Sequence, residues 1–293
     1  MLTIAAVLFL PPVFSQEQKV LFEKESQYHY IIVDEVDGLR TMHFRRKGRE
    51  YDESKVNKND PYTPVLNYTR LFFSSFLFCP KAKKVLMIGL GGGSVPRIIH
   101  KFFPQVQIDT VELDPAVVEA AKKHFFYVTD DRSRAIVRDG RVQVRIFLKK
   151  NVKYDIVMLD AFRGGYIPYH LTTKEFMEQC KGLLTERGIV AANMRPDFMI
   201  YDYHKRTIAS VFPSLFTFGK KGNKICVALP RKKDYSESQL RRVAMSLQSK
   251  YSPSFRLPEL LNEFDPKIDY ETRGEIFTDD YAPVNVLRGI PRE

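Results

Sequence analysis

Four acidic side chains stand where predicted β-strands end, a position from which carboxylates can hydrogen-bond a ligand. They are Glu112, Asp114, Asp139 and Asp160. In an open α/β sheet the carboxyl ends of the strands line one crevice, so these side chains are expected to share a ligand site. Each could instead cap a helix or close a turn, and Asp114, which precedes Pro115, is typical of a helix cap.

A glycine-rich turn lies upstream of these acids, between the apolar run 85–88 and a helix that begins near Ser94. Its glycines are Gly89, Gly91, Gly92 and Gly93. Glycines let the backbone turn sharply and approach a ligand, and the helix start offers unpaired N–H groups. The dinucleotide pattern needs a third small residue at the position of Ser94, so a donor of the S-adenosylmethionine type fits better than a nicotinamide or flavin.

The acids can be given separate roles toward such a donor. Glu112, about 20 residues after the turn, suits the two ribose hydroxyls. Asp139, which precedes Gly140, could accept a hydrogen bond from the adenine amino group. Asp160 would lie next to the sulfonium of the donor.

The surrounding pattern predicts the elements that position these residues. Expected strands are 85–88, 108–113, 134–138, 154–159 and 188–193, and expected helices are 65–78, 115–125, 172–184, 202–212 and 236–250. The segment 141–150 stays open, because it alternates like a strand but stands where a crossover helix is needed. Segments 216–218 and 225–228 suggest a closing antiparallel pair. This order predicts an α/β protein with a parallel sheet wound on both faces.

The chain ahead of this domain has a different pattern. Residues 19–64 are expected to form a small N-terminal β domain, with a hairpin at Asp37-Gly38 and a polar loop over 51–64. Residues 65–293 are expected to form a larger, nucleoside-binding domain. Residues 1–15 resemble a secretory signal and favour an exported protein, although the absence of Lys and Arg before the apolar run leaves a cytoplasmic protein as the alternative.

Composition narrows the classes of partner. The excess of 46 Lys and Arg over 35 Asp and Glu gives a net charge of +11, but the basic clusters are scattered, so a nucleic-acid site is not favoured. No apolar run approaches the ~18 residues of a membrane span. The six histidines and three cysteines show no spacing typical of a metal site.

The chain resembles the spermidine synthase (polyamine aminopropyltransferase) superfamily, in particular a divergent spermidine synthase-like branch, from about Tyr28 to Asn285. The motifs that carry the resemblance are IGLGGGSVPR, VELDPAVV, Asp139-Gly140, YDIVMLDAF, IPYHLTTKEF and TDDYAPVN. The resemblance implies a Rossmann-like, methyltransferase-type domain behind a small β domain, a homodimer, and transfer of an aminopropyl group from decarboxylated S-adenosylmethionine to an amine. It also implies that Asp160 accepts the proton of the amine.

Two positions depart from the pattern of the well-studied synthases. The resemblance places an Asp that pairs with the donor ammonium where this chain has Ser94, and a second polyamine-binding Asp where it has Arg163. A guanidinium in place of a carboxylate should repel a diamine. Other residues that could rebuild the acceptor pocket are Tyr166, Asp279, Asp280 and Tyr281, although the TDDYAPVN segment could equally be a structural turn.

Three hypotheses follow. The first is an aminopropyltransferase with a rebuilt acceptor site. The second is a methyltransferase that uses ordinary S-adenosylmethionine on an unknown acceptor, which Ser94 and Arg163 favour. The third is a homologue that binds a nucleoside ligand without catalysis. Either donor would act as a co-substrate, and none of the three needs a metal.

Overall fold

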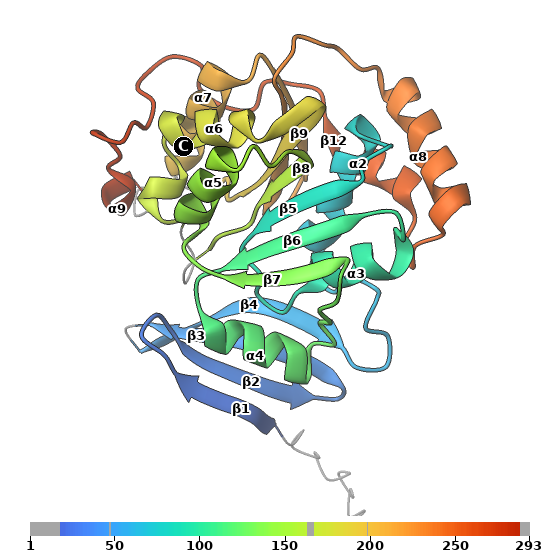
Figure 1. Ribbon diagram of the computed structural model, residues 1–293, viewed down its shortest axis with the longest axis vertical. Coiled ribbons are helices and arrows are strands. Elements are labelled where there is room, and N and C mark those ends of the chain that lie inside the picture. Colours follow the sequence, from blue (N-terminus) through green and yellow to red (C-terminus); the bar gives the residue numbers. More distant parts are fainter. Residues whose placement is uncertain (1–17, 47, 163–166, 198, 288–293) are drawn as a thin grey trace, which may run out of the picture.

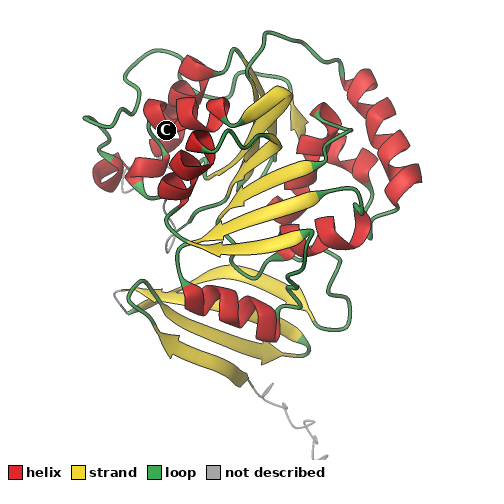
Figure 2. Ribbon diagram, in the orientation of Figure 1, coloured by secondary structure: helices red, strands yellow, loops and turns green. Residues whose placement is uncertain are grey.

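The computed structural model describes residues 18–46, 48–162, 167–197 and 199–287. The described chain forms two sheets (Figures 1 and 2). The N-terminal sheet is antiparallel and contains β1 (Lys19–Glu25), β2 (Tyr30–Val36), β3 (Leu39–Arg46) and β4 (Arg49–Asn57), in that order. The predicted signal-like segment 1–15 lies outside the described residues, and the predicted boundary at residue 64 stays a prediction.

The larger sheet has eight strands in the order β12-β10-β11-β9-β8-β5-β6-β7. Their bounds are β5 (Lys84–Ile88), β6 (Gln107–Glu112), β7 (Ser133–Val137), β8 (Tyr154–Leu159), β9 (Leu184–Met194), β10 (Ser214–Phe218), β11 (Lys224–Leu229) and β12 (Phe264–Asp265). The five strands from β7 to β9 are parallel, and β11, β10 and β12 continue the sheet in antiparallel pairs. The predicted doubly wound fold and closing antiparallel pair are confirmed.

Helices cover both faces of this sheet (Figure 2). One face carries α1 (Asn67–Leu71), the 3₁₀ turn η1 (Phe72–Ser74), α2 (Ser75–Phe78), α3 (Ser94–Phe102), α8 (Glu237–Tyr251) and η3 (Leu257–Glu263). The other face carries α5 (Gly140–Lys149), η2 (Tyr169–Leu171), α6 (Lys174–Gly182) and α7 (Ile200–Val211), with α9 (Val284–Leu287) outside them (Figure 1). Two separate apolar cores therefore flank the buried strands, as the continuous apolar runs of those strands require.

Helix α4 (Pro115–His124) packs on the N-terminal sheet and joins it to the rest of the molecule (Figure 1). Its Val117 and Ala120 are buried against Ile31 and Val33 of β2, while Ala121 faces Leu90 of the glycine-rich turn. Asp114 caps the helix by accepting a hydrogen bond from the Ala116 N–H at 2.9 Å. The predicted capping role of Asp114 is confirmed.

The structure settles one open segment and corrects another. Residues 140–149 form the crossover helix α5, because Asp139 caps it and Val144 and Phe147 fall on one buried side. The prediction of a loop over 51–64 was wrong for its first part, which is strand β4. Its polar side chains concealed the strand, yet every residue from Arg49 to Lys55 except Glu53 pairs with β3. No described helix is long and apolar enough to cross a membrane.

Candidate functional site

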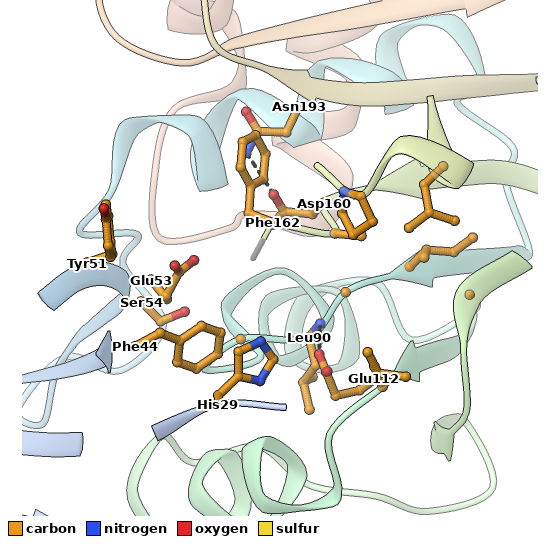
Figure 3. A pocket seen from close by; sticks show the side chains of 18 of the residues that line it. His29, Phe44, Tyr51, Glu53, Ser54, Leu90, Glu112, Asp160, Phe162 and Asn193 are labelled. Atoms are coloured by element: carbon orange, nitrogen blue, oxygen red, sulfur yellow. Dashed lines mark hydrogen bonds between the residues drawn. The ribbon is translucent and has the colours of Figure 1, made fainter. Parts of the chain in front are cut away.

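The chain order places a crevice at the carboxyl ends of β5 and β8. From β5 the chain runs outward through β6 and β7, then returns to β8 on the opposite side of β5. Neighbouring strand ends that lead away in opposite directions leave room for a ligand between them. A cavity of about 520 Å³ lies here, and the N-terminal sheet closes its far side through β4 (Figure 3).

The glycine-rich turn has the backbone that its sequence predicts. Gly89 has φ 94°, and a Cβ there would lie 2.4 Å from the backbone oxygen of Asp160. Gly91 has φ 52°, and a Cβ would lie 2.6 Å from the Ser54 hydroxyl. Both line the cavity, so glycine is required where the turn meets β8 and β4.

The other two glycines of the turn have a packing role. The Gly92 N–H donates to Ser54 Oγ at 2.7 Å, and side chains at Gly92 or Gly93 would meet the rings of Phe125 or Tyr127. Neither glycine lines the cavity. Their predicted contact with the donor therefore stays a prediction, and their observed contacts fix the turn against its surroundings.

Glu112 ends β6 and lines the cavity with a carboxylate held at both oxygens. One oxygen accepts from the Leu90 N–H at 2.9 Å and the other from the Asp114 N–H at 3.0 Å. Burial raises the pKa of the Glu112 carboxyl, and the two backbone N–H groups oppose that rise. The carboxylate is fixed in place and retains lone pairs for a ligand hydroxyl, which is the geometry that ribose recognition needs.

Asp139 and Gly140 lie at the neighbouring corner of the cavity. Asp139 caps α5 through the Val142 N–H at 2.9 Å, and its other oxygen lies 2.9 Å from Nε2 of His170. The bond with His170 lowers the pKa of Asp139. Gly140 packs against Ile88, where a Cβ would come within 2.5 Å of the side chain. Asp139 thus combines the capping role with a place in the site.

Asp160 follows β8 and lines the cavity beside the end of β5. Its N–H donates to the Ile88 carbonyl at 2.8 Å, and its Oδ1 accepts from Nδ2 of Asn193 at 2.7 Å (Figure 3). Burial and the charge of Glu112 raise the pKa of Asp160 to about 7, while the hydrogen bond from Asn193 opposes the rise. A carboxyl that titrates near neutral pH suits general base catalysis.

Two cavity residues next to Asp160 were not among the predicted site residues. Tyr68, from α1, is half-buried, and burial together with the charges of Asp160 and Glu53 raises its pKa well above the usual value. Its hydroxyl donates to the Glu53 carbonyl at 3.3 Å. Glu53 belongs to β4, and its carboxylate points into the cavity (Figure 3). This half of the cavity is therefore acidic.

His29 is a further cavity residue that the sequence analysis missed. Its ring stacks on Phe44 at a centroid distance of 4.2 Å, and its Nδ1 lies 3.0 Å from Oδ2 of Asp114. The side chain is 9% exposed, and Nε2 has no hydrogen-bond partner among the described residues. It lies beside Leu90 and Glu112 (Figure 3). This arrangement leaves a buried nitrogen available to a ligand hydroxyl.

Several residues named for the acceptor lie elsewhere. Asp279 pairs with Arg141 through two hydrogen bonds of 2.7 Å and accepts from the Thr173 hydroxyl at 2.8 Å. Asp279, Asp280 and Tyr281 do not line the cavity, so their substrate role stays a prediction and the turn interpretation gains support. Tyr166 and Arg163 lie outside the described residues.

Ser94 also lies away from the cavity. It is the first residue of α3, and its hydroxyl accepts from Nη2 of Arg97 at 3.3 Å. A carboxylate for a donor ammonium must therefore come from another element. Within the described part of the chain, no three His, Cys, Asp or Glu side chains are grouped so that they could hold a metal ion.

Comparison with known structures agrees with the fold. The chain superimposes with a TM-score of 0.64 on a spermidine synthase in complex with the transition-state analogue AdoDATO, at 22% identity over 85% of this chain and 84% of that one. A TM-score of 0.59 relates it to human methyltransferase-like protein 13 in complex with SAH, at 22% identity over 70% of this chain and 96% of that one. The methyltransferase-type Rossmann fold is confirmed.

Relatives found by sequence identify the family, which the fold alone does not. A polyamine aminopropyltransferase of Vibrio vulnificus is 30% identical over 95% of both chains. The human eEF1A lysine and N-terminal methyltransferase is 29% identical over 45% of this chain but only 20% of its own length. The family model described as spermine/spermidine synthase domain matches residues 67–230, which span β5 to β11 and every predicted donor residue. The chain therefore belongs to the spermine/spermidine synthase family.

Proposed function

We propose that this transferase moves the aminopropyl group of decarboxylated S-adenosylmethionine to an amine, with Asp160 as general base. The observation that carries the proposal is the division of one cavity into two halves. The half at the glycine-rich turn offers fixed groups for a nucleoside, and the half at β4 is acidic. Asp160 lies where the halves meet.

The donor half can hold the adenosine. Glu112 would accept from the ribose hydroxyls, His29 Nε2 lies nearby as a further acceptor, and Asp139 would accept from the adenine amino group. An adenosyl co-substrate agrees with the ligands named for the related structures, AdoDATO and SAH.

The acidic half suits an ammonium group. The charges of Asp160 and Glu53 both raise the pKa of Tyr68, so two carboxylates act on this end of the cavity. An ammonium about 4 Å from one of these carboxylates would be attracted by about 4 kcal/mol at an effective dielectric constant of about 20. A decarboxylated donor presents only a cationic tail, whereas the carboxylate of the ordinary donor would be repelled.

The reaction is a displacement at the carbon next to the sulfonium. The amine loses its proton to the ionised Asp160, its lone pair forms a new C–N bond, and the C–S bond breaks with its electrons moving to sulfur. The sulfonium becomes the neutral thioether of methylthioadenosine. The protein contributes alignment of donor and amine and a place for the proton.

Methyl transfer from ordinary S-adenosylmethionine is the second candidate. Arg195 lines the same cavity, and a guanidinium is a good partner for the carboxylate of that donor. The partial similarity to the human lysine methyltransferase points the same way. In this alternative Arg195, and not Glu53, selects the donor.

Calorimetric titration with both donors separates the two candidates. The proposal expects tighter binding of the decarboxylated donor and, in E53Q, an approximately tenfold loss of that preference. E50Q is the matched control, because Glu50 lines the cavity from the same strand and its carboxylate is held by Arg45 at 2.7 Å. Preference for ordinary S-adenosylmethionine would establish the methyltransferase alternative, and binding without turnover on any amine would establish a non-catalytic homologue.

We further propose a homodimer, as the resemblance implies, and export directed by residues 1–15, with a cytoplasmic protein as the alternative. Analytical ultracentrifugation of the full chain tests the first. Sequencing the amino terminus of the protein made in its native cell tests the second, since export with cleavage would remove the leading segment.

A further inference from the structure

A chain of two side-chain amides leads from a hairpin to Asp160. Nδ2 of Asn193 donates to Oδ1 of Asp160 at 2.7 Å, and Nδ2 of Asn223 donates to Oδ1 of Asn193 at 3.1 Å. Asn193 belongs to β9 and is 1% exposed. Asn223 comes from the turn just before β11, the strand that pairs with β9 next to Asn193. The three residues come from three separate segments.

The direction of these bonds decides which form of Asp160 is favoured. An amide group has an oxygen that only accepts and an NH₂ that only donates. Because Asn223 occupies the oxygen of Asn193, the NH₂ of Asn193 faces Asp160. A donor aimed at a carboxylate stabilises its ionised form. If the Asn193 amide were reversed, its oxygen would instead accept a hydrogen bond from the O–H of the protonated Asp160.

We propose that Asn223 keeps Asp160 in its proton-accepting form by fixing the orientation of the Asn193 amide. Asn223 is therefore a positioning residue that acts on the general base through a second side chain. The consequence for catalysis rests on the proposed function, but the orientation of the amide does not.

Other groups also influence Asp160. The titratable and charged residues that line its cavity are His29, Glu50, Tyr51, Asp52, Glu53, Tyr68, Glu112, Asp139, His170 and Arg195. Glu112 opposes ionisation of Asp160 through its charge. Substitutions at Asn223 leave every one of these side chains in place, so they change the amide chain without removing a neighbour of the base.

The direct test measures the protonation of Asp160 in the protein without substrate. Carboxyl ¹³C NMR of aspartate-labelled protein follows the titration, with D160N to assign the signal. In N223A the midpoint should rise by about half a pH unit. In N223D it should rise by about one unit, tenfold in proton affinity, because the introduced carboxylate would draw the Asn193 NH₂ toward itself and adds a like charge near Asp160. N223S keeps a donor hydroxyl and should restore most of the wild-type midpoint.

Because the charge of N223D can raise the midpoint by itself, the neutral N223A decides the test. K221A, which truncates an exposed side chain two residues away, is the control for the hairpin. Equal midpoints in wild type and N223A would overturn the proposal whatever N223D does, as would an equal shift in K221A. The pH profile of kcat should move with the NMR midpoint. Shifted NMR midpoints without turnover on any amine would keep the amide chain and overturn the proposed function instead.

Discussion

Replacing Asp160 by Asn should stabilise the protein at neutral pH while removing its activity. The pKa of Asp160 is raised from 3.8 to about 7, mainly by burial. Between these values the folded state binds a proton that the unfolded state has lost, so the contribution of Asp160 to stability falls as the pH rises through this window. Above pH 7 the folded protein bears the full cost of a buried carboxylate.

The size of the effect follows from the shift. A rise of about three pKa units, at about 1.4 kcal/mol each, sets an upper bound of about 4 kcal/mol. Water in the open cavity reduces this, and we expect D160N to gain about 1–2 kcal/mol at pH 8. The amide oxygen of the new side chain still accepts from Asn193, so the local hydrogen bond is kept. At pH 4 the gain should vanish.

The assay is thermal unfolding of both proteins at several pH values from 4 to 8, with activity measured in parallel. D160N should lose about 10²–10⁴-fold in kcat, the usual contribution of a general base. Wild-type activity should fall about tenfold from pH 8 to pH 6, as the ionised fraction of Asp160 falls. D130N is a control with the opposite expected effect on stability. His100 lowers the pKa of that exposed acid, so D130N should lower the stability at neutral pH and not raise it. A stability difference that does not change with pH would refute the reasoning.

Three further predictions concern other parts of the site. H29F keeps the stack on Phe44 but removes the buried Nε2 together with the Nδ1 contact to Asp114, so donor affinity should fall about fivefold to tenfold by calorimetry, with H29Q between H29F and the wild type; unchanged affinity would exclude His29 from the donor site. G91A should lose donor binding, because its Cβ meets Ser54 at 2.6 Å, whereas G222A, at a similar positive φ but in open space, should cost only about 1 kcal/mol by chemical unfolding. D279N should lower stability above pH 4 and lose that effect as the pH falls, because Arg141 lowers the pKa of Asp279; an increase in the KM for the amine alone would instead establish a substrate role.

The donor side of the site could be predicted because its signals are local. The glycine-rich turn, the apolar strands and the acids that end them are contiguous in sequence, and the fold rules place such strand ends together. Glu112, Asp139 and Asp160 accordingly line one cavity. The sequence pattern of α5 suits a strand or a helix equally well. Only the rule that a crossover joins parallel strands favours the helix there.

The acidic side of the cavity could not be predicted in the same way. Glu53 lies on a strand whose polar sequence resembles a loop, and it reaches the cavity only because α4 holds the N-terminal sheet against the turn. The roles of Asn193 and Asn223 depend on the pairing of β9 with β11, which no short motif reveals. Local patterns identify residues that approach a ligand from their own strand ends. They do not show which distant segment closes the cavity.

Because β4 contacts the glycine-rich turn, its residues could change specificity in evolution or engineering while the larger sheet stays the same. The parallel sheet holds Glu112 and Asp139, which would recognise adenosine together with His29 from the turn before β2, while Tyr51, Glu53 and Ser54 come from β4. A hairpin can be exchanged between relatives without rewriting the larger sheet, provided that a small hydroxyl residue still meets the Gly92 N–H. Libraries confined to residues 49–53, with Ser54 kept, should therefore change the choice of substrate tail while leaving nucleoside affinity intact.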